Sequence, residues 1–308
     1  MVATRRLEAL SSSIAQRLDL PTGPWMVALS GGADSAALAW FAARLGKARA
    51  VHVHHGWPAS DRLQAAALGV AEALKMTVEV ARVDLDRVSE TAARTARYEA
   101  LDRRLRPSEW ILTAHTLDDQ AETVLANLLR GSGLDGLAGI PARRGRIARP
   151  LLDVSRSETR ELAALASLPW IDDPYNLDPT PLRNRIRLAL IPQLEEQFNP
   201  GLRRHLASAA RAVAGLAVMA PDPGEMSENG WRAPAGVLWA LGEQKAIDLL
   251  RRAVRALRLD YGLDRAEARR VWSVVAGDAT ATELRGRLRV ERDGPWITIT
   301  RSAGARLD

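Results

Sequence analysis

The chain has 308 residues, of which 47% are hydrophobic and 26% are charged, a composition typical of a globular protein long enough for two domains. Its 43 lysines and arginines exceed its 37 acidic residues and give a net charge of +6, which fits either a polyanionic partner or a merely basic surface. It has no cysteine, which excludes disulfides, cysteine-ligated zinc, iron–sulfur clusters and persulfide relays within it.

The first part of the chain alternates between short apolar strands and helices. A helix is expected over 2–19, then strands at 26–29, 48–53, 77–83 and 110–113, separated by helices that end at 45 and span 61–75 and 89–106. This alternation predicts an α/β fold with a doubly wound parallel sheet. In such a sheet, ligands bind outside the carboxyl ends of the strands, where neighbouring strands send their helices to opposite faces.

Helices predominate in the remainder of the larger domain. They are expected from 117 to 129 and at 157–167, 183–196 and 202–218, with a glycine-rich mobile loop at 130–140. Residues 220–230 have the composition of a linker or a long loop. The helices expected after it are at 235–258 and 264–276, and a hairpin joins strands 288–291 and 296–299. The predicted domains are therefore 1–218 and a smaller α+β domain over 230–308.

Neither a targeting signal nor a membrane span is visible in the sequence. The beginning of the chain has an amphipathic pattern without a long apolar core, and no segment approaches the length that crosses a bilayer. We therefore expect a cytoplasmic protein that does not contact a membrane.

Residues 30–35 join the first strand to an alanine-rich helix and read Ser-Gly-Gly-Ala-Asp-Ser. Two glycines allow positive φ and close approach of the backbone, so successive N–H groups can bind an anion at the start of the helix. Ser30 and Ser35 add hydroxyl donors. Asp34 would repel a phosphate unless a divalent cation lay between them, which indicates metal-assisted nucleotide chemistry. The alternative is a plain glycine turn.

This pattern resembles the PP-loop of ATP pyrophosphatases, which split ATP into AMP and pyrophosphate while adenylating a substrate. It is not a Walker loop, because no lysine follows the glycines. The resemblance implies a fold like that of the adenine nucleotide alpha hydrolases, with the first and fourth strands as neighbours. The loops at Ser30 and His115 would then face each other across one crevice.

A second group of polar residues, Asp118, Asp119 and Glu122, begins the helix expected from 117. Asp118 and Glu122 are four residues apart on one helix face, with Asp119 beside them. Three carboxylates near a phosphate loop repel one another unless they hold a cation, either Mg²⁺ or a substrate ammonium group. A solvated helix start is the alternative, because acidic residues favour the first turn of any helix.

The pattern from His115 to Thr123, His-x-x-Asp-Asp-x-x-Glu-Thr, is similar to the signature of tRNA(Ile)-lysidine synthetases and of related tRNA thiolases. The resemblance extends from Val27 to about Leu194, and the lack of cysteine disfavours the thiolases. Further matches to the lysidine branch are Ala93-Arg94-x-x-Arg97-Tyr98, the 129–140 loop, Arg149-Pro150-Leu151, Asp173-Pro174-x-Asn176 and Arg183-Asn184-x-x-Arg187.

The resemblance implies a two-step reaction on a tRNA(Ile) with a CAU anticodon. ATP adenylates carbon 2 of the wobble cytidine and releases pyrophosphate, and the ε-amine of L-lysine then displaces AMP. The partners implied are this tRNA and L-lysine, and the oligomeric state is left open. The other functions weighed are the synthetase domain of an ATP-dependent amidotransferase and a nucleotide sensor without turnover, which leave the acidic helix or the arginine motifs without a task.

The resemblance also assigns roles to individual residues. Asp34 with Asp118 or Asp119 would hold Mg²⁺, another carboxylate would deprotonate the lysine, and Glu122 would bind it. The catalytic candidates are Asp34, His115, Asp118, Asp119, Glu122, Arg183 and Arg187, with Asp34 and Asp119 as the metal ligands. The ATP-binding candidates are Ser30, Gly31, Gly32, Ala33, Asp34, Ser35 and His54.

The remaining basic residues are expected to contact phosphates. Arg94, Arg97, Arg183 and Arg187 are candidates for the polyphosphate or the tRNA backbone, although each could instead form a surface ion pair. The stretch from Arg143 to Arg149 is a candidate contact with RNA phosphates. Of the histidines at 52, 54 and 55, only the first two share a strand face, so we expect an adenine pocket there rather than a metal site.

Overall fold

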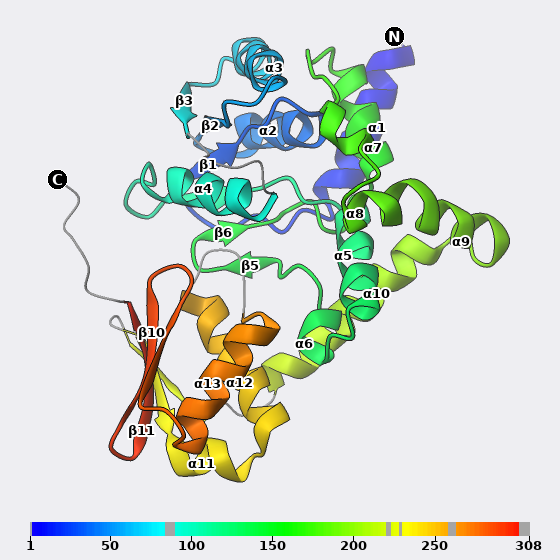
Figure 1. Ribbon diagram of the computed structural model, residues 1–308. Coiled ribbons are helices and arrows are strands. Elements are labelled where there is room, and N and C mark those ends of the chain that lie inside the picture. Colours follow the sequence, from blue (N-terminus) through cyan, green and yellow to red (C-terminus); the bar gives the residue numbers. More distant parts are fainter. Residues whose placement is uncertain (1, 84–89, 220–222, 228–229, 258–262, 302–308) are drawn as a thin grey trace. The chain divides into compact units, whose positions relative to one another are not determined.

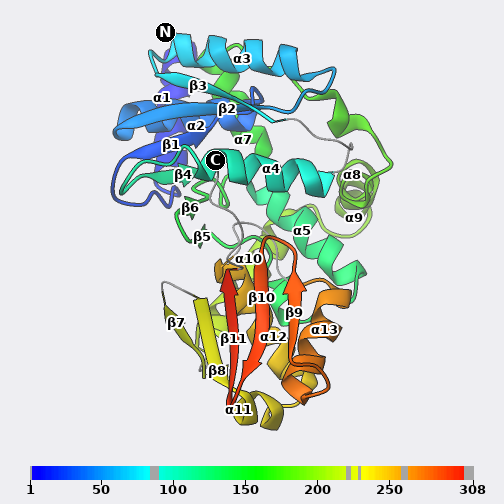
Figure 2. The ribbon, with the colours of Figure 1, turned by 60° about the vertical axis from the view of Figure 1, so that its left-hand side comes forward.

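The computed structural model divides the chain into two units, residues 1–217 and 218–308. It describes residues 2–83, 90–219, 223–227, 230–257 and 263–301. Figures 1 and 2 show the elements of each unit in two views. No helix in these ranges combines the length and the apolar character that a bilayer span requires.

A six-stranded sheet forms the centre of the first unit. Its strand order is β3-β2-β1-β4-β6-β5, and every pair is parallel except the edge pair of β5 and β6. The predicted adjacency of the first and fourth strands is confirmed. The strands are β1 (Trp25–Ala28), β2 (Ala48–His54), β3 (Val78–Arg82), β4 (Trp110–Leu112), β5 (Arg143–Arg144) and β6 (Ile147–Ala148).

Helices cover both faces of this sheet, as expected for a doubly wound fold. The buried side chains of α1, α2, α3 and α7 share one apolar core with β1. The alanines of α2 bring its backbone close to the sheet, because they add little side-chain bulk. Outside this core, α4 lies against β2 and β3. Helix α5 forms a separate apolar cluster with α8, α9 and α10. The helices with bounds are α1 (Val2–Ala15), α2 (Ala33–Leu45), α3 (Ser60–Ala73), α4 (Glu90–Asp102), α5 (Leu117–Leu129), α6 (Leu134–Leu137), α7 (Arg156–Leu165), α8 (Leu182–Arg185), α9 (Ile191–Gln197) and α10 (Leu202–Met219).

Two parts of this unit differ from the sequence expectation. The glycine-rich stretch contains the short helix α6, and the arginine-rich stretch after it forms β5 and β6. Two-residue strands are too short to show an alternating pattern, which is why they were not predicted. Helices α8 and α9 are joined by a π-helical turn, Ile186–Leu190, so the helix expected over 183–196 is present as one continuous run of turns.

The second unit is a five-stranded antiparallel sheet with three helices. Its strand order is β7-β8-β11-β10-β9, and its apolar residues form a core of their own. The predicted hairpin is present, with Asp293 paired to Trp296 around Gly294 at φ +56°. The elements are β7 (Glu225–Ser227), β8 (Gly230–Pro234), α11 (Ala235–Ala240), α12 (Glu243–Leu257), α13 (Arg265–Ala276), β9 (Ala281–Leu284), β10 (Leu288–Asp293) and β11 (Trp296–Arg301).

Two expectations for this unit were wrong. The helix expected over 235–258 is divided into α11 and α12, because Gly242 has φ +77° and ends the first of them. The stretch expected to be a linker includes strand β7, which pairs with β8. Strand β9, which was not predicted either, completes the far edge of the sheet.

Candidate active site

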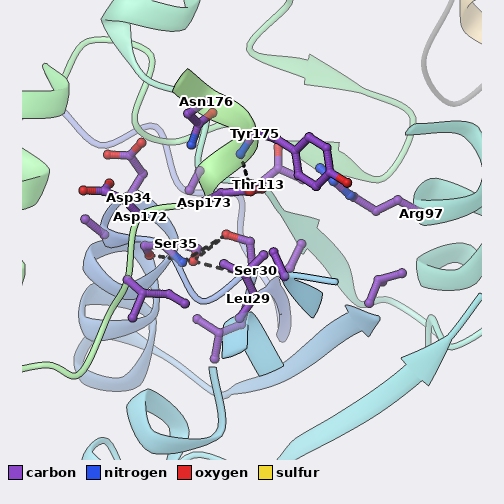
Figure 3. A pocket seen from close by; sticks show the side chains of 18 of the residues that line it. Leu29, Ser30, Asp34, Ser35, Arg97, Thr113, Asp172, Asp173, Tyr175 and Asn176 are labelled. Carbon is purple, nitrogen blue, oxygen red and sulfur yellow. Dashed lines mark hydrogen bonds between the residues drawn. The ribbon is translucent and has the colours of Figure 1, made fainter. Parts of the chain in front are cut away.

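A cavity of about 550 Å³ lies at the carboxyl ends of β1, β2 and β4 in the first unit. Its wall includes the segments that follow these three strands, together with α7 and the 171–177 segment. In Figure 3, Asp34 and Asp172 lie on one side of the cavity and Arg97 lies on the other. This is the edge of the sheet at which the parallel fold predicts a ligand.

The phosphate loop, residues 30–35, is held by hydrogen bonds among its own atoms. The backbone N–H of Ser30 donates to Ser35 Oγ at 3.2 Å, the two hydroxyls lie 3.0 Å apart, and Ser35 Oγ donates to the Gly32 carbonyl at 2.9 Å. The Gly32 N–H donates to Ser30 Oγ at 3.4 Å. The loop therefore keeps its shape from contacts within six residues, at the start of α2 where backbone N–H groups favour an anion.

The two glycines of the phosphate loop have different conformations. Gly31 has φ +92°, and a Cβ atom there would lie 2.3 Å from the Leu63 carbonyl oxygen. Gly32 precedes α2 with φ −89°, and the nearest atom to a Cβ there would be Ser30 Oγ at 3.6 Å. The positive φ expected of both glycines is therefore required only at Gly31.

The acidic start of α5 is organised by a cap and by arginines. Thr116 and Asp119 form a capping box, in which Asp119 Oδ2 accepts from the N–H and the hydroxyl of Thr116 at 2.8 and 2.9 Å. Asp119 Oδ1 accepts from Arg156 at 3.1 Å and from Arg183 at 2.9 Å. Glu122 is 1% exposed and accepts two hydrogen bonds from Arg187, at 2.7 and 2.9 Å. These carboxylates are therefore compensated by guanidinium groups, not by solvent.

Arg156, the first residue of α7, connects the acidic residues to the phosphate loop. Its guanidinium group donates to Glu122 at 3.1 Å and to Asp119, and lies 3.7 Å from Asp34. Its backbone N–H donates to Asp118 at 2.8 Å. Four carboxylates thus converge on one residue, and together they raise the pKa of Arg156 although burial opposes this.

Sequence reasoning missed Arg156, although a signal was present. The capping box of Ser155 and Glu158 marks the start of α7 and places Arg156 in its first turn. A cation is unfavourable there, because the start of a helix carries partial positive charge. An arginine in this position indicates that nearby anions compensate it. Thr159, which is fully buried, was also missed, and its hydroxyl donates to Asp34 Oδ1.

The two aspartates of the cavity wall titrate in opposite directions. Burial, followed by the nearby Asp119, raises the pKa of Asp34 to about 6, although Thr159 and Arg156 oppose the shift. Burial also opposes the charged form of Asp119, but Arg183 and Arg156 outweigh it and hold the pKa of that carboxyl well below its ordinary value. Asp119 is therefore an anion at neutral pH, while Asp34 lacks full compensation.

Three histidines approach the cavity, in different states. Burial and the nearby Arg94 and Arg149 lower the pKa of His115, so its imidazole is neutral at neutral pH. His52 and His55 also line the cavity, and His52 Nε2 and His55 Nδ1 are buried without a hydrogen-bond partner among the described residues. His54 does not line it, because its ring nitrogens contact Asp61 Oδ1 at 3.0 Å and the Gly56 N–H at 3.2 Å.

The structure brings most of the predicted site residues to this cavity. Those that line it are Ser30, Gly32, Ala33, Asp34, Ser35, His115, Asp119 and Arg187. Gly31, His54, Asp118, Glu122 and Arg183 lie outside the lining, and Asp118, Glu122 and Arg183 contact residues that belong to it. The predicted phosphate contact Arg97 lines the cavity, whereas Arg94 lies over the Tyr98 ring with 5.6 Å between Cζ and the ring centroid.

The donor set fits a divalent cation at Asp34 better than at Asp119. The raised pKa of Asp34 shows that its anion is incompletely compensated, which favours a cation beside it. Both oxygens of Asp119 are already engaged by Thr116 and arginines. No group of three or more histidine, aspartate or glutamate side chains in the described ranges has the arrangement of a metal site. A cation would thus draw its remaining ligands from a nucleotide and water, as Mg²⁺ commonly does.

Comparison with known proteins identifies a family domain and several similar proteins. The PP-loop domain matches residues 3–194. A tRNA(Ile)-lysidine synthase of Pseudomonas aeruginosa is 39% identical over 236 residues, which cover 68% of this chain and 52% of that protein. The tRNA(Ile)-lysidine synthase of Salinispora tropica is 43% identical over 241 residues, 72% of each chain. This chain thus spans about half the length of the first relative and nearly three quarters of the second.

A solved structure supports the fold. The U34-tRNA thiolase NcsA from Methanococcus maripaludis, solved with its [4Fe-4S] cluster, superposes with a TM-score of 0.57 over 70% of this chain and 80% of that one. The two sequences are 18% identical. At that identity the similarity concerns the fold alone.

Proposed function

The chain belongs to the PP-loop family and, within it, to the tRNA(Ile)-lysidine synthases, and from this membership we propose that it ligates L-lysine to carbon 2 of a wobble cytidine. The substrate is a tRNA(Ile) with the anticodon CAU. ATP is split into AMP and pyrophosphate in the course of the reaction. We place the reaction in the cytoplasm, where this tRNA is used.

The observation that carries this proposal is the convergence of two distant segments on one cavity. Asp34 comes from the phosphate loop and Asp119 from α5, and Arg156 lies within 3.7 Å of the first and 3.1 Å of the second. A loop suited to phosphates and a cluster suited to a cationic substrate group therefore share one site. A nucleotide sensor would need only the first of them.

In the first step, the chain's main task is to position the phosphates. The N–H groups and hydroxyls of the phosphate loop hold the polyphosphate, and the start of α2 adds favourable dipoles. Mg²⁺, held by Asp34 and nucleotide oxygens, would neutralise the charge of the departing pyrophosphate. Asp119 would hold Mg²⁺ only if Arg156 and Arg183, which both donate to its Oδ1, moved away. The α-phosphorus then transfers to the cytosine, and the bond to pyrophosphate breaks.

In the second step, the acidic residues receive the lysine. Its ammonium group has the charge of the Arg156 guanidinium, so the carboxylates that Arg156 bridges form its binding region. Of these carboxylates, Glu122 does not line the cavity, and it accepts hydrogen bonds from Arg183 at 2.9 Å and from Arg187 at 2.7 Å, which orients both guanidinium groups. His115 is neutral and lines the cavity, so its imidazole can accept the proton that the amine loses. The amine attacks carbon 2, and the bond to AMP breaks.

The proposal is tested by following both products with purified protein. With ATP, Mg²⁺ and radiolabelled lysine, the tRNA(Ile) transcript with a CAU anticodon should release pyrophosphate and acquire one lysine. The tRNA(Met) transcript, which has the same anticodon, should acquire none. Pyrophosphate release without lysine in the RNA would contradict the proposal, as would a product that contains sulfur when a sulfur donor is supplied.

A further inference from the structure

Two aromatic side chains, Trp57 and Tyr175, form a rim on the cavity wall. Trp57 follows β2, and Tyr175 belongs to a short 3-10 turn, Pro174–Leu177. Their ring centroids lie 5.1 Å apart with 55° between the planes, and both residues line the cavity. Tyr175 is 38% exposed and Trp57 is half-buried. Large aromatic surface is thus left open where the site meets solvent.

The aromatic rim is held in place without any ligand. The Tyr175 N–H donates to Asp173 at 3.0 Å, and its carbonyl accepts from Asn184 at 2.8 Å. The Trp57 N–H donates to Ser60 Oγ at 3.0 Å. The segment before Tyr175 is also joined to the phosphate loop, because the Ile171 N–H donates to the Gly31 carbonyl at 3.1 Å. A preformed surface of this kind loses little conformational entropy on binding.

Stacking is the interaction that such a surface offers. Unpaired nucleotides of RNA loops are commonly bound by stacking on aromatic side chains, whose rings accept any base. A base that reacts inside a cavity must first leave its stack in the anticodon loop, and a protein ring can replace the contact that it loses. The rim lies beside Arg97, whose guanidinium donates to His55 at 3.3 Å and provides positive charge near the entering strand.

The adenine of ATP is a less suitable occupant of the rim. Adenine needs hydrogen-bond partners, and the unpartnered nitrogens His52 Nε2 and His55 Nδ1 lie in the cavity wall at the end of β2. Burial and then Arg97 lower the pKa of His55 to about 4, so this ring stays neutral. Its Nε2 accepts from Arg97, so the unpartnered Nδ1 carries the proton and is a donor, whereas His52 donates from Nδ1 to the Leu29 carbonyl and keeps Nε2 as an acceptor. These histidines can bind the nucleotide base, which leaves the exposed rim for a base that enters from solvent.

We propose that Trp57 and Tyr175 stack on the unpaired wobble pyrimidine of the anticodon loop as it enters the cavity. The inference rests on the proposed function and adds to it the surface that receives the RNA base. It assigns to these rings affinity for RNA and no part in binding ATP.

The experiment uses the full chain and an anticodon stem-loop that carries pyrrolo-cytidine, a fluorescent cytosine analogue quenched by stacking, at the wobble position. Trp57→Ala and Tyr175→Ala should each raise the Kd of the stem-loop by about tenfold and reduce the quenching. Trp57→Phe and Tyr175→Phe keep a ring and should stay within about threefold of the wild type. The KM for ATP should not change in any of the four variants.

Phe198→Ala is the matched control, because Phe198 is 76% exposed and does not line the cavity. It should leave both affinity and quenching unchanged, and thermal unfolding identifies any variant that has lost its fold. A raised KM for ATP with unchanged RNA affinity would overturn the inference in favour of an adenine surface. Unchanged affinities for both would overturn it as well. If the wild type incorporates lysine into the tRNA while either of these results is found, the proposed function stands and only the stacking inference is overturned.

Discussion

The phosphate loop and the acidic start of α5 face the same cavity, but they are held in different ways. In the loop, Ser30, Gly32 and Ser35 bond to one another across at most five positions of the chain. The carboxylates of Asp119 and Glu122 are held by arginines that lie 34 to 65 positions away. The loop therefore depends on local backbone geometry, whereas the acidic cluster depends on the complete tertiary structure.

Of the variants that test this difference, Arg156→Ala is expected to change the free energy of unfolding most. The variant leaves several buried carboxylates with one guanidinium group fewer, and breaking a buried ion pair typically costs about 3 to 5 kcal/mol. Urea unfolding monitored by circular dichroism should show this loss of stability. The matched control is Arg143→Ala, whose partner Asp19 is exposed, and it should change stability by less than about 1 kcal/mol. Equal effects of the two variants would show that the acidic cluster is not held by its arginines.

The same contrast explains how far the sequence predicts the site. The sequence indicates the conformation of the loop because its contacts are local, although the positive φ expected of both glycines is present only at Gly31. The acidic residues were identified, but their partners were expected to be Mg²⁺ or lysine. Arg156 reaches them from α7, and Thr159 of the same helix reaches Asp34. Both contacts depend on the packing of α7 against α2, which no spacing in the sequence encodes. The same limit applies to His54, which shares a side of β2 with His52 but contacts Asp61 of α3 outside the cavity lining.

The second prediction concerns activity and tests the contribution of the Asp34 carboxylate to pyrophosphate release. Asp34→Asn should lower kcat/KM for pyrophosphate release by about 100-fold or more, because it removes the charge proposed to hold a cation at the phosphates. Asp19→Asn, which changes an exposed carboxylate paired with Arg143, is the control and should keep full activity. An Asp34→Asn variant with wild-type turnover would show that Asp34 has no catalytic role.

The third prediction concerns the stability of the same variant as a function of pH. The pKa of Asp34 is raised to about 6, so the folded state binds this proton more tightly than the unfolded state. The carboxyl therefore makes folding less favourable as the pH rises from 4 to 6, and the loss persists above pH 6. Asp34→Asn should be more stable than the wild type by on the order of 1 to 3 kcal/mol at pH 7 and nearly equal at pH 4. A difference that does not vary between pH 4 and pH 7 would contradict the raised pKa.

The fourth prediction tests whether the phosphate loop depends on its backbone. Gly31→Ala should destabilise the first unit by at least about 1 to 2 kcal/mol, because it forces a side chain into the left-handed region and towards the Leu63 carbonyl. Gly32→Ala should stay within about 0.5 kcal/mol, since the φ of Gly32 suits any residue. Thermal unfolding of the two variants measures the difference. Equal stabilities would mean that the loop can relax, and the local account of it would fail.

The fold was more predictable in the first unit than in the second, where only β10 and β11 of the five strands of the sheet were predicted. Strands β1 to β4 and helices α2 and α3 were found because apolar strand segments and helical segments alternate there at short spacing. Strands β5, β6, β7, β8 and β9 were missed, because each has only two to five residues and lies outside that alternation. The split at Gly242 shows that a single positive φ can end a helix inside a strongly periodic segment.

The smallest effect is expected from the arginine-rich edge of the sheet, which supplies neither part of the cavity. Arg143 is exposed there, and neutralising Arg143, Arg144 and Arg146 to glutamine should weaken tRNA binding and reduce the slope of log Kd against log salt concentration by about 2. ATP affinity should not change. Arg149 belongs to the same stretch but is 2% exposed and donates to the Pro141 carbonyl at 2.8 Å. Arg149→Gln should therefore lower stability and leave the salt slope as it is, whereas an unchanged slope in the triple variant would remove this edge from the RNA-binding surface.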